Sequence, residues 1–189
     1  MATFMPLKIT KLDAARRQLR TAITLWFNDG DPVAIHALAF ASYEILHVVS
    51  EKRNPNRMKL VFDSDFIPKE FRKEANIAIR KSANFFKHGD RDPEAILEFN
   101  PEMSKCFILF AIQALQLCGE SIGDEEIAFL LWIHIHDPDL VTGEGERKLI
   151  DSLPVEVLLQ LRGTVKNNFL HFLQTCKLAH AYPEKLGGS

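Results

Sequence analysis

The chain has 189 residues, of which 47% are hydrophobic and 25% are charged, and its formal net charge is -2. This composition excludes intrinsic disorder, a collagen-like repeat and a disulfide-rich scaffold, and it leaves enough apolar side chains for one compact core. No apolar run approaches the roughly 20 residues of a membrane-spanning helix, and residues 1–11 lack the apolar stretch of a signal peptide. We therefore expect a cytoplasmic protein without a membrane partner.

The first half of the chain has the periodicity of helices. Between residues 11 and 28 apolar side chains recur three and four positions apart, and Asp31-Pro32 is typical of an N-cap followed by a first-turn proline. These signals predict a helical hairpin over residues 11–50. Residues 51–66 are polar and lack a sustained period, which indicates a loop, and a third helix is predicted over residues 68–88.

The second half of the chain contains the most apolar helices. The segment 101–121 is apolar nearly all round, so we expect it in the centre of the fold or in an interface. A second apolar helix is predicted over residues 124–136, and a C-terminal helical region over residues 153–180, with a bend at Gly163. No strand pattern appears, so the sequence predicts an all-α fold, a single-domain helical bundle of about six helices over residues 1–189.

Charge is concentrated in two neighbouring segments. Residues 51–91 contain 11 basic and 6 acidic residues, a balance of +5, whereas residues 92–151 contain 3 basic and 13 acidic residues, a balance of -10. A basic segment of this kind fits an RNA backbone or an acidic protein partner, and ordinary solvated helix faces are the alternative. Its cations are Arg53, Arg57, Lys59, Lys69, Arg72, Lys73, Arg80, Lys81 and Lys87.

The most suggestive candidate site lies at the end of the predicted third helix. Lys81, Asn84 and His88 stand at i, i+3 and i+7, so a cation, an amide and an imidazole share one helix face. Such a trio can bind a phosphate and move a proton near neutral pH, which makes these three the candidate catalytic residues. The alternative is that His88 only caps the helix end while the other two are solvated. Four neighbouring cations are candidates for substrate binding: Arg72, Lys73, Arg80 and Lys87.

The segment Asn84-Phe-Phe-Lys-His88 resembles the Asn-x-x-x-His portion of the motif of HEPN nucleases, which are small all-helical, metal-independent ribonucleases. The family motif places an arginine before the asparagine, whereas this chain has Ala83 there, and the nearest upstream cations are Lys81 and Arg80. Residues 84–93, together with the helix around residues 34–38, are also similar to a group of bacterial proteins that have no assigned activity. The resemblance implies an all-α fold, RNA as a partner and dimerisation.

A second group of polar side chains lies on one stripe of the predicted second helix. His36, Tyr43 and His47 follow helical spacing, and His36 and Tyr43 would complete a site with Asn84 and His88 if this stripe faced the third helix. A core stripe with satisfied polar atoms is the alternative.

No convincing metal or cofactor motif is present. Glu44-x-x-His47 lacks the second copy that a di-iron bundle needs, and the His134-x-His136-Asp137 spacing fits a metal-dependent phosphohydrolase poorly. We therefore expect no metal and no cofactor. The odd number of cysteines, and their apolar surroundings, favour reduced and buried thiols at Cys106, Cys118 and Cys176.

Two functions remain open at this point. The first is a HEPN-like RNA-binding domain with metal-independent ribonuclease activity. The second is a non-catalytic protein-interaction or scaffold domain that acts as a homodimer, which the missing arginine and the very apolar segments 101–121 and 124–136 favour.

Overall fold

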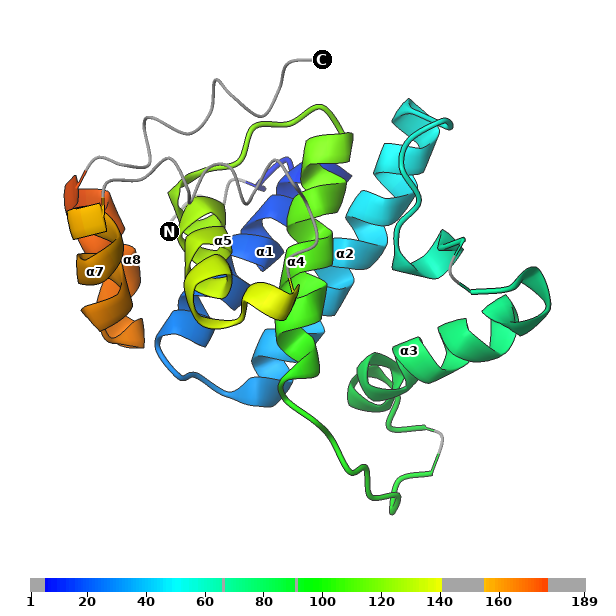
Figure 1. Ribbon diagram of the computed structural model, residues 1–189. Helices are drawn as coiled ribbons and strands as arrows, with labels where there is room; N and C mark the ends of the chain where they lie inside the picture. Colours follow the sequence, from blue (N-terminus) through cyan, green and yellow to red (C-terminus); the bar gives the residue numbers. More distant parts are fainter. Residues whose placement is uncertain (1–5, 66, 91, 141–154, 177–189) are drawn as a thin grey trace.

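The computed structural model describes residues 6–65, 67–90, 92–140 and 155–176 (Figure 1). All regular structure in these ranges is helical, so the predicted all-α fold is confirmed. The α-helices are α1 (Lys11–Phe27), α2 (Pro32–Arg53), α3 (Arg72–Lys87), α4 (Met103–Leu117), α5 (Asp124–His136), α7 (Val155–Gly163) and α8 (Lys166–Cys176). Two short 3-10 helices, η1 (Val61–Asp63) and η2 (Lys69–Phe71), lie between α2 and α3, and a third, η3 (Pro138–Leu140), follows α5.

The helices α1 and α2 form the predicted hairpin. The Asp31 carboxylate accepts a hydrogen bond from the Ala34 amide at 2.8 Å and caps α2. Small residues let the two helices approach closely, and the Ser42 hydroxyl donates to the Ala15 carbonyl across the contact at 2.9 Å. The second helix continues to Arg53, a little beyond the predicted end of the hairpin.

By length and composition, α2 is the one helix in the described ranges that qualifies as a candidate membrane span. Half of its apolar window is buried inside the bundle, which is the pattern of a core helix. Its buried face packs against α1 and α4.

Helix α4 lies inside the bundle, where it packs against α1 and α2 (Figure 1), and Lys105 of α4 pairs with Asp137 at the end of α5 at 2.8 Å. Ile108, Ala111 and Ile112 are fully buried, which explains why the segment is apolar on several faces. Of the two places predicted for this segment, the centre of the fold is the one observed. Cys118 at its end is a buried free thiol, and burial raises its pKa; Cys106 is half-buried and free.

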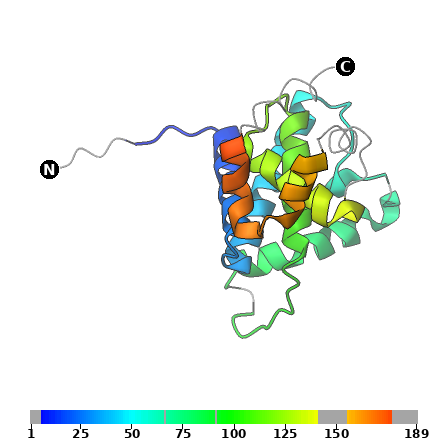
Figure 2. The same ribbon diagram turned by 60° about the vertical axis from the view of Figure 1, so that its left-hand side comes forward.

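The short helices α7 and α8 close one side of the bundle, with α8 running beside α1 (Figure 2). The Phe169 ring stacks on Phe27 with centroids 5.9 Å apart and meets Trp132 edge-on at 5.0 Å. The predicted bend at Gly163 is observed as the break between the two helices. Residues 153–154 and 177–180 of the predicted C-terminal region lie outside the described residues.

Helix α3 stands at the edge of the molecule and contacts the bundle through α2 and η1 (Figure 1). Ala83 is its one fully buried side chain, and the Asn76 amide donates to the Phe62 carbonyl at 3.0 Å. Within the loop predicted over residues 51–66, Arg57 contacts Asp63 at 3.3 Å and folds the chain back onto α2. One face of α3 is therefore covered by the bundle and the other faces solvent.

Candidate functional site

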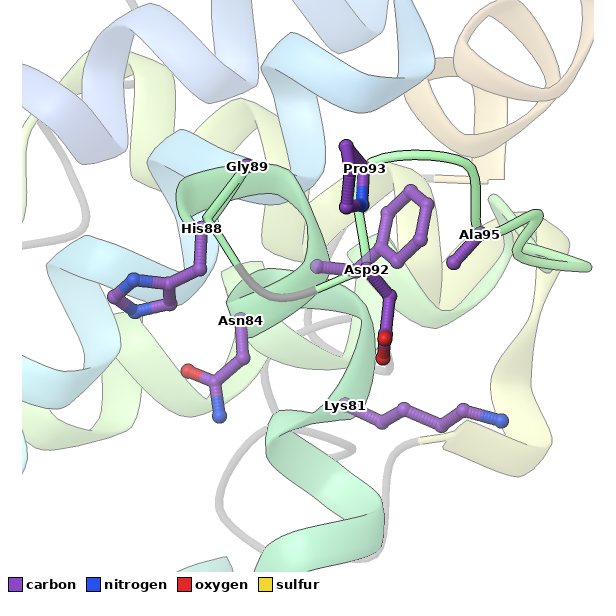
Figure 3. A pocket seen from close by; sticks show the side chains of 8 residues that line it. Lys81, Asn84, His88, Gly89, Asp92, Pro93 and Ala95 are labelled. Carbon is purple, nitrogen blue, oxygen red and sulfur yellow. The ribbon is translucent and has the colours of Figure 1, made fainter.

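A pocket of about 340 Å³ lies at the carboxyl end of α3 (Figure 3). Side chains three, four and seven positions apart share a helix face, so the solvent-facing side of α3 supplies one wall. The turn after the helix supplies the other. The lining residues are Lys81, Asn84, Phe85, His88, Gly89, Asp92, Pro93 and Ala95. The structure thus brings the three candidate catalytic residues, Lys81, Asn84 and His88, to one pocket.

His88 is the C-cap residue of α3, and its backbone N–H donates to the Asn84 carbonyl at 3.1 Å. Its side chain is 44% exposed, and Nδ1 lies 3.9 Å from the nearest Asp90 carboxylate oxygen. At that distance the carboxylate does not hold the ring by a hydrogen bond. The imidazole is accessible to a ligand in the pocket.

Lys81 and Asn84 are both exposed. The Asn84 amide and the His88 ring lie on one side of the pocket, whereas the Lys81 side chain extends toward the other (Figure 3). Lys81 forms no ion pair with a described residue. Its ammonium group and the imidazole therefore point to opposite sides of the pocket and do not meet at one point (Figure 3).

Five pocket residues are absent from the sequence-based site, and two of them, Phe85 and Asp92, bring an aromatic ring and a carboxylate to it. Phe85 follows Lys81 by four positions, so helical spacing carries the signal that places it beside the trio. Asp92 has a positive φ of 85°, a conformation that costs a residue with a side chain of order 1–3 kcal/mol, and its carboxylate points along the Lys81 stem (Figure 3). No sequence signal distinguished it from an ordinary aspartate in a turn.

Arg80 and Lys87, two of the predicted substrate-binding cations, are engaged in ion pairs away from the pocket. Both cations bind Glu44 of α2, and the distance from Lys87 Nζ to Glu44 Oε2 is 3.2 Å. The Arg80 guanidinium also lies over the Phe62 ring, 4.1 Å from its centroid. These residues lie on the side of α3 that borders the pocket face and turns toward α2, and their ion pairs with Glu44 fasten the helix to the bundle.

Arg72 and Lys73, the other two predicted substrate-binding cations, differ in their surroundings. Arg72 donates to the Ile67 carbonyl at 3.1 Å and to Asp65 at 3.2 Å, so it holds the start of α3 against the preceding turn. Lys73 is exposed, makes no ion pair with a described residue and remains available to a ligand.

His36 and Tyr43 do not complete the pocket, because both lie in the core. His36 is 1% exposed, its Nδ1 lies 3.3 Å from the Ser104 hydroxyl, and burial lowers its pKa to about 4. Tyr43 is fully buried against Phe62, and burial raises its pKa. The core-stripe alternative describes the burial of these two residues, but its satisfied polar atoms are not observed, because His36 Nε2 and the Tyr43 hydroxyl have no hydrogen-bond partner among the described residues.

Phe86 explains why the core stripe and the pocket are separate. Its ring meets His36 edge-on, with centroids 5.8 Å apart. Phe86 is two residues from both Asn84 and His88, and side chains two apart on a helix point to nearly opposite sides. The stripe on α2 thus faces α3, but it meets the side that carries Phe86.

The Glu44-x-x-His47 element does not form a joint site. Glu44 is occupied by the two cations of α3, whereas His47 Nε2 lies 3.2 Å from an oxygen of Asp63. Within the described ranges, no three His, Cys, Asp or Glu side chains are grouped as metal ligands would be.

No family model, no curated protein and no solved structure matches this chain. What the pocket can do therefore follows from its own geometry and chemistry.

Proposed function

We propose that this chain is an RNA-binding domain that cleaves RNA without a metal ion at the pocket of α3. The observation that carries the proposal is the grouping of Lys81, Asn84 and His88 around one accessible pocket. The resemblance of Asn84-Phe-Phe-Lys-His88 to HEPN nucleases supports the same activity.

Four of the pocket residues have a part in this reaction. Lys81 binds the phosphate, Asn84 donates to one of its oxygens, and the 40% exposed Phe85 ring offers a face on which an unpaired base stacks. His88 takes the proton of the 2′-hydroxyl as the 2′-oxygen bonds to phosphorus. The bond from phosphorus to the 5′-oxygen then breaks, that oxygen takes a proton from water, and a 2′,3′-cyclic phosphate remains.

The charges around the pocket set the strength of binding. Arg80 and Lys87 share the single negative charge of Glu44, and Arg72 lies against Asp65, so few cations remain without an ion-pair partner to replace counterions. For single strands the logarithm of affinity falls with the logarithm of salt by roughly 0.7 per phosphate contacted. We expect weak binding with a shallow salt dependence.

The test compares His88→Ala and Lys81→Ala with the wild type on labelled single-stranded RNA in EDTA. Removing the acid–base group should slow cleavage by roughly 10²–10⁴-fold, and removing the ammonium should weaken binding and lower the salt slope. His171→Ala and Lys52→Ala, which alter exposed residues on α8 and α2, are the matched controls. Cleavage by His88→Ala at the wild-type rate, with the helical content unchanged, would contradict the proposal.

A non-catalytic interaction domain is the second candidate. It is supported by Ala83, which stands at the position of the family's arginine and is completely buried, so the pocket receives no arginine from that position. Under this alternative, the wild type shows no cleavage at any RNA concentration, and exposed apolar side chains of α3 provide the binding surface.

A further inference from the structure

The solvent-facing side of α3 carries a row of apolar residues that the bundle leaves uncovered. Phe71 in η2 is 60% exposed, Ile77 is 62% exposed and Phe85 is 40% exposed. Their spacing places them along one side of α3 and the 3-10 turn before it. Large apolar side chains that line up on a surface mark an interaction site more often than isolated ones do.

Two opposite charges alternate with these apolar residues. Glu74 lies between Phe71 and Ile77 in sequence, and Lys81 lies between Ile77 and Phe85. Both side chains are exposed, and neither makes an ion pair with a described residue. The order along the helix is therefore apolar, acidic, apolar, basic, apolar.

When two copies of α3 lie antiparallel, this order places each charge opposite a charge of the other sign. The midpoint between Glu74 and Lys81 lies between Ile77 and Ala78. Each of the two charged residues is about 5 Å from that point along the helix axis, at a rise of 1.5 Å per residue. Phe71 and Phe85 lie about 10 Å from the same point on either side, to within one residue. In an antiparallel pair centred there, each glutamate meets a lysine and each outer phenylalanine meets the other.

We propose that α3 pairs antiparallel with α3 of a second copy of this chain, around a two-fold axis near Ile77. A two-fold axis turns one self-complementary face into a closed dimer. The charge pattern selects a second copy as the occupant, because that copy presents Lys81 opposite Glu74 and Glu74 opposite Lys81. A partner of one charge sign would leave one of these charges unmatched.

The location of this interface differs from the one that the apolar fourth helix suggested. Most apolar side chains of α4 are buried within the chain, where α4 packs against α1 and α2, so α4 offers no comparable surface. An interface of one helix pair is smaller than the roughly 1,600 Å² of a standard complex, which predicts micromolar association. Lys81 and Phe85 also line the pocket, so the pairing engages two residues that the proposed function gives to RNA, and the inference stands independently of RNA cleavage.

Charge reversal tests the pairing directly. Glu74→Lys presents lysine at both charged positions, and Lys81→Glu presents glutamate at both. Each variant alone should therefore repel its own copies, and its dimer Kd should rise at least about tenfold by sedimentation. An equimolar mixture of the two variants should form heterodimers, because every lysine then faces a glutamate.

The full-length chain with both reversals should dimerise like the wild type, and Lys52→Glu on α2 controls for the change in net charge. Circular dichroism of each variant checks the fold. A wild type that is monomeric at about 100 µM would overturn the proposal. Wild-type association by each single-reversal variant alone, or failure of the two to associate when mixed, would also overturn it.

Discussion

At the scale of single residues, two histidines named as candidates from the sequence have opposite environments. His88 lies at a helix end with an accessible ring, whereas His36 is enclosed by the rings of Phe40, Phe86, Phe99 and Phe107. An enclosed ring loses the hydration that stabilises its charged form, so His36 stays neutral over the physiological range. His36 therefore serves the core, and His88 is the one available for acid–base chemistry in the pocket.

The burial of His36 makes the stability of the fold depend on pH. The unfolded chain binds a proton on this ring near the ordinary pKa of 6.5, but the folded chain does so only near a pKa of about 4. Acid therefore favours the unfolded chain. The free energy of unfolding has its full value, as far as His36 is concerned, above pH 6.5, and it decreases as the pH falls toward 4. Across that window the loss amounts to about 3 kcal/mol.

Replacing His36 with leucine should remove this part of the pH dependence. Urea unfolding at several pH values between 4 and 7 would measure it, with His171→Leu on α8 as the exposed control. If the free energy of unfolding of His36→Leu falls with acid as steeply as that of the wild type, the ring is not what makes the fold acid-sensitive.

At the scale of elements, α3 is held to the bundle mainly along one line of contact with α2 and η1. The Glu44 carboxylate forms ion pairs with both Arg80 and Lys87. Asn76 and Ala83 contact the bundle along the same side of α3. Few buried apolar contacts support this helix compared with α4, so α3 is expected to open locally before the core does. The candidate pocket and the proposed dimer interface both lie on this less stable element.

Glu44→Gln should loosen α3 without unfolding the bundle. The change removes the charge that two cations share, and a partly exposed cluster of this kind contributes roughly 1 kcal/mol. Hydrogen exchange should rise in residues 72–87 and stay unchanged in residues 103–117. Glu51→Gln, an exposed change near the end of α2, is the control. Equal protection of α3 in Glu44→Gln and the control would show that the ion pairs do not hold the helix.

At the scale of the whole molecule, the aromatic residues join the C-terminal helices to the first hairpin. Phe169 of α8 lies between Phe27 of α1 and Trp132 of α5, and Trp26 meets Trp132 at 6.1 Å. Lys166 adds an ion pair with Asp29 at 2.6 Å and lies over the Trp26 ring. Helices separated by more than 100 residues in sequence thus share one part of the core.

Phe169→Ala should destabilise the fold by about 3–5 kcal/mol, because truncating a fully buried phenylalanine leaves a cavity that its neighbours fill only in part. Thermal unfolding followed by tryptophan fluorescence would measure the change, since both tryptophans lie near the cavity. Val165→Ala, at an exposed position before α8, should shift the midpoint little. A loss below about 1 kcal/mol for Phe169→Ala would mean that α8 does not share the core.

The sequence by itself determined the helices and the grouping of Lys81, Asn84 and His88, because helical periodicity and i, i+3, i+7 spacing are local properties of the chain. It did not determine which side of α3 would be covered. That depends on Glu44, which lies 36 residues from Arg80 and 43 from Lys87 and binds both of them. The same packing buried His36 and Tyr43 and left Phe85 exposed, because these outcomes depend on contacts between segments that are distant in sequence. The path of the turn after α3 brought Asp92 to the pocket. Tertiary structure therefore decided which of the polar residues seen in the sequence a ligand can reach.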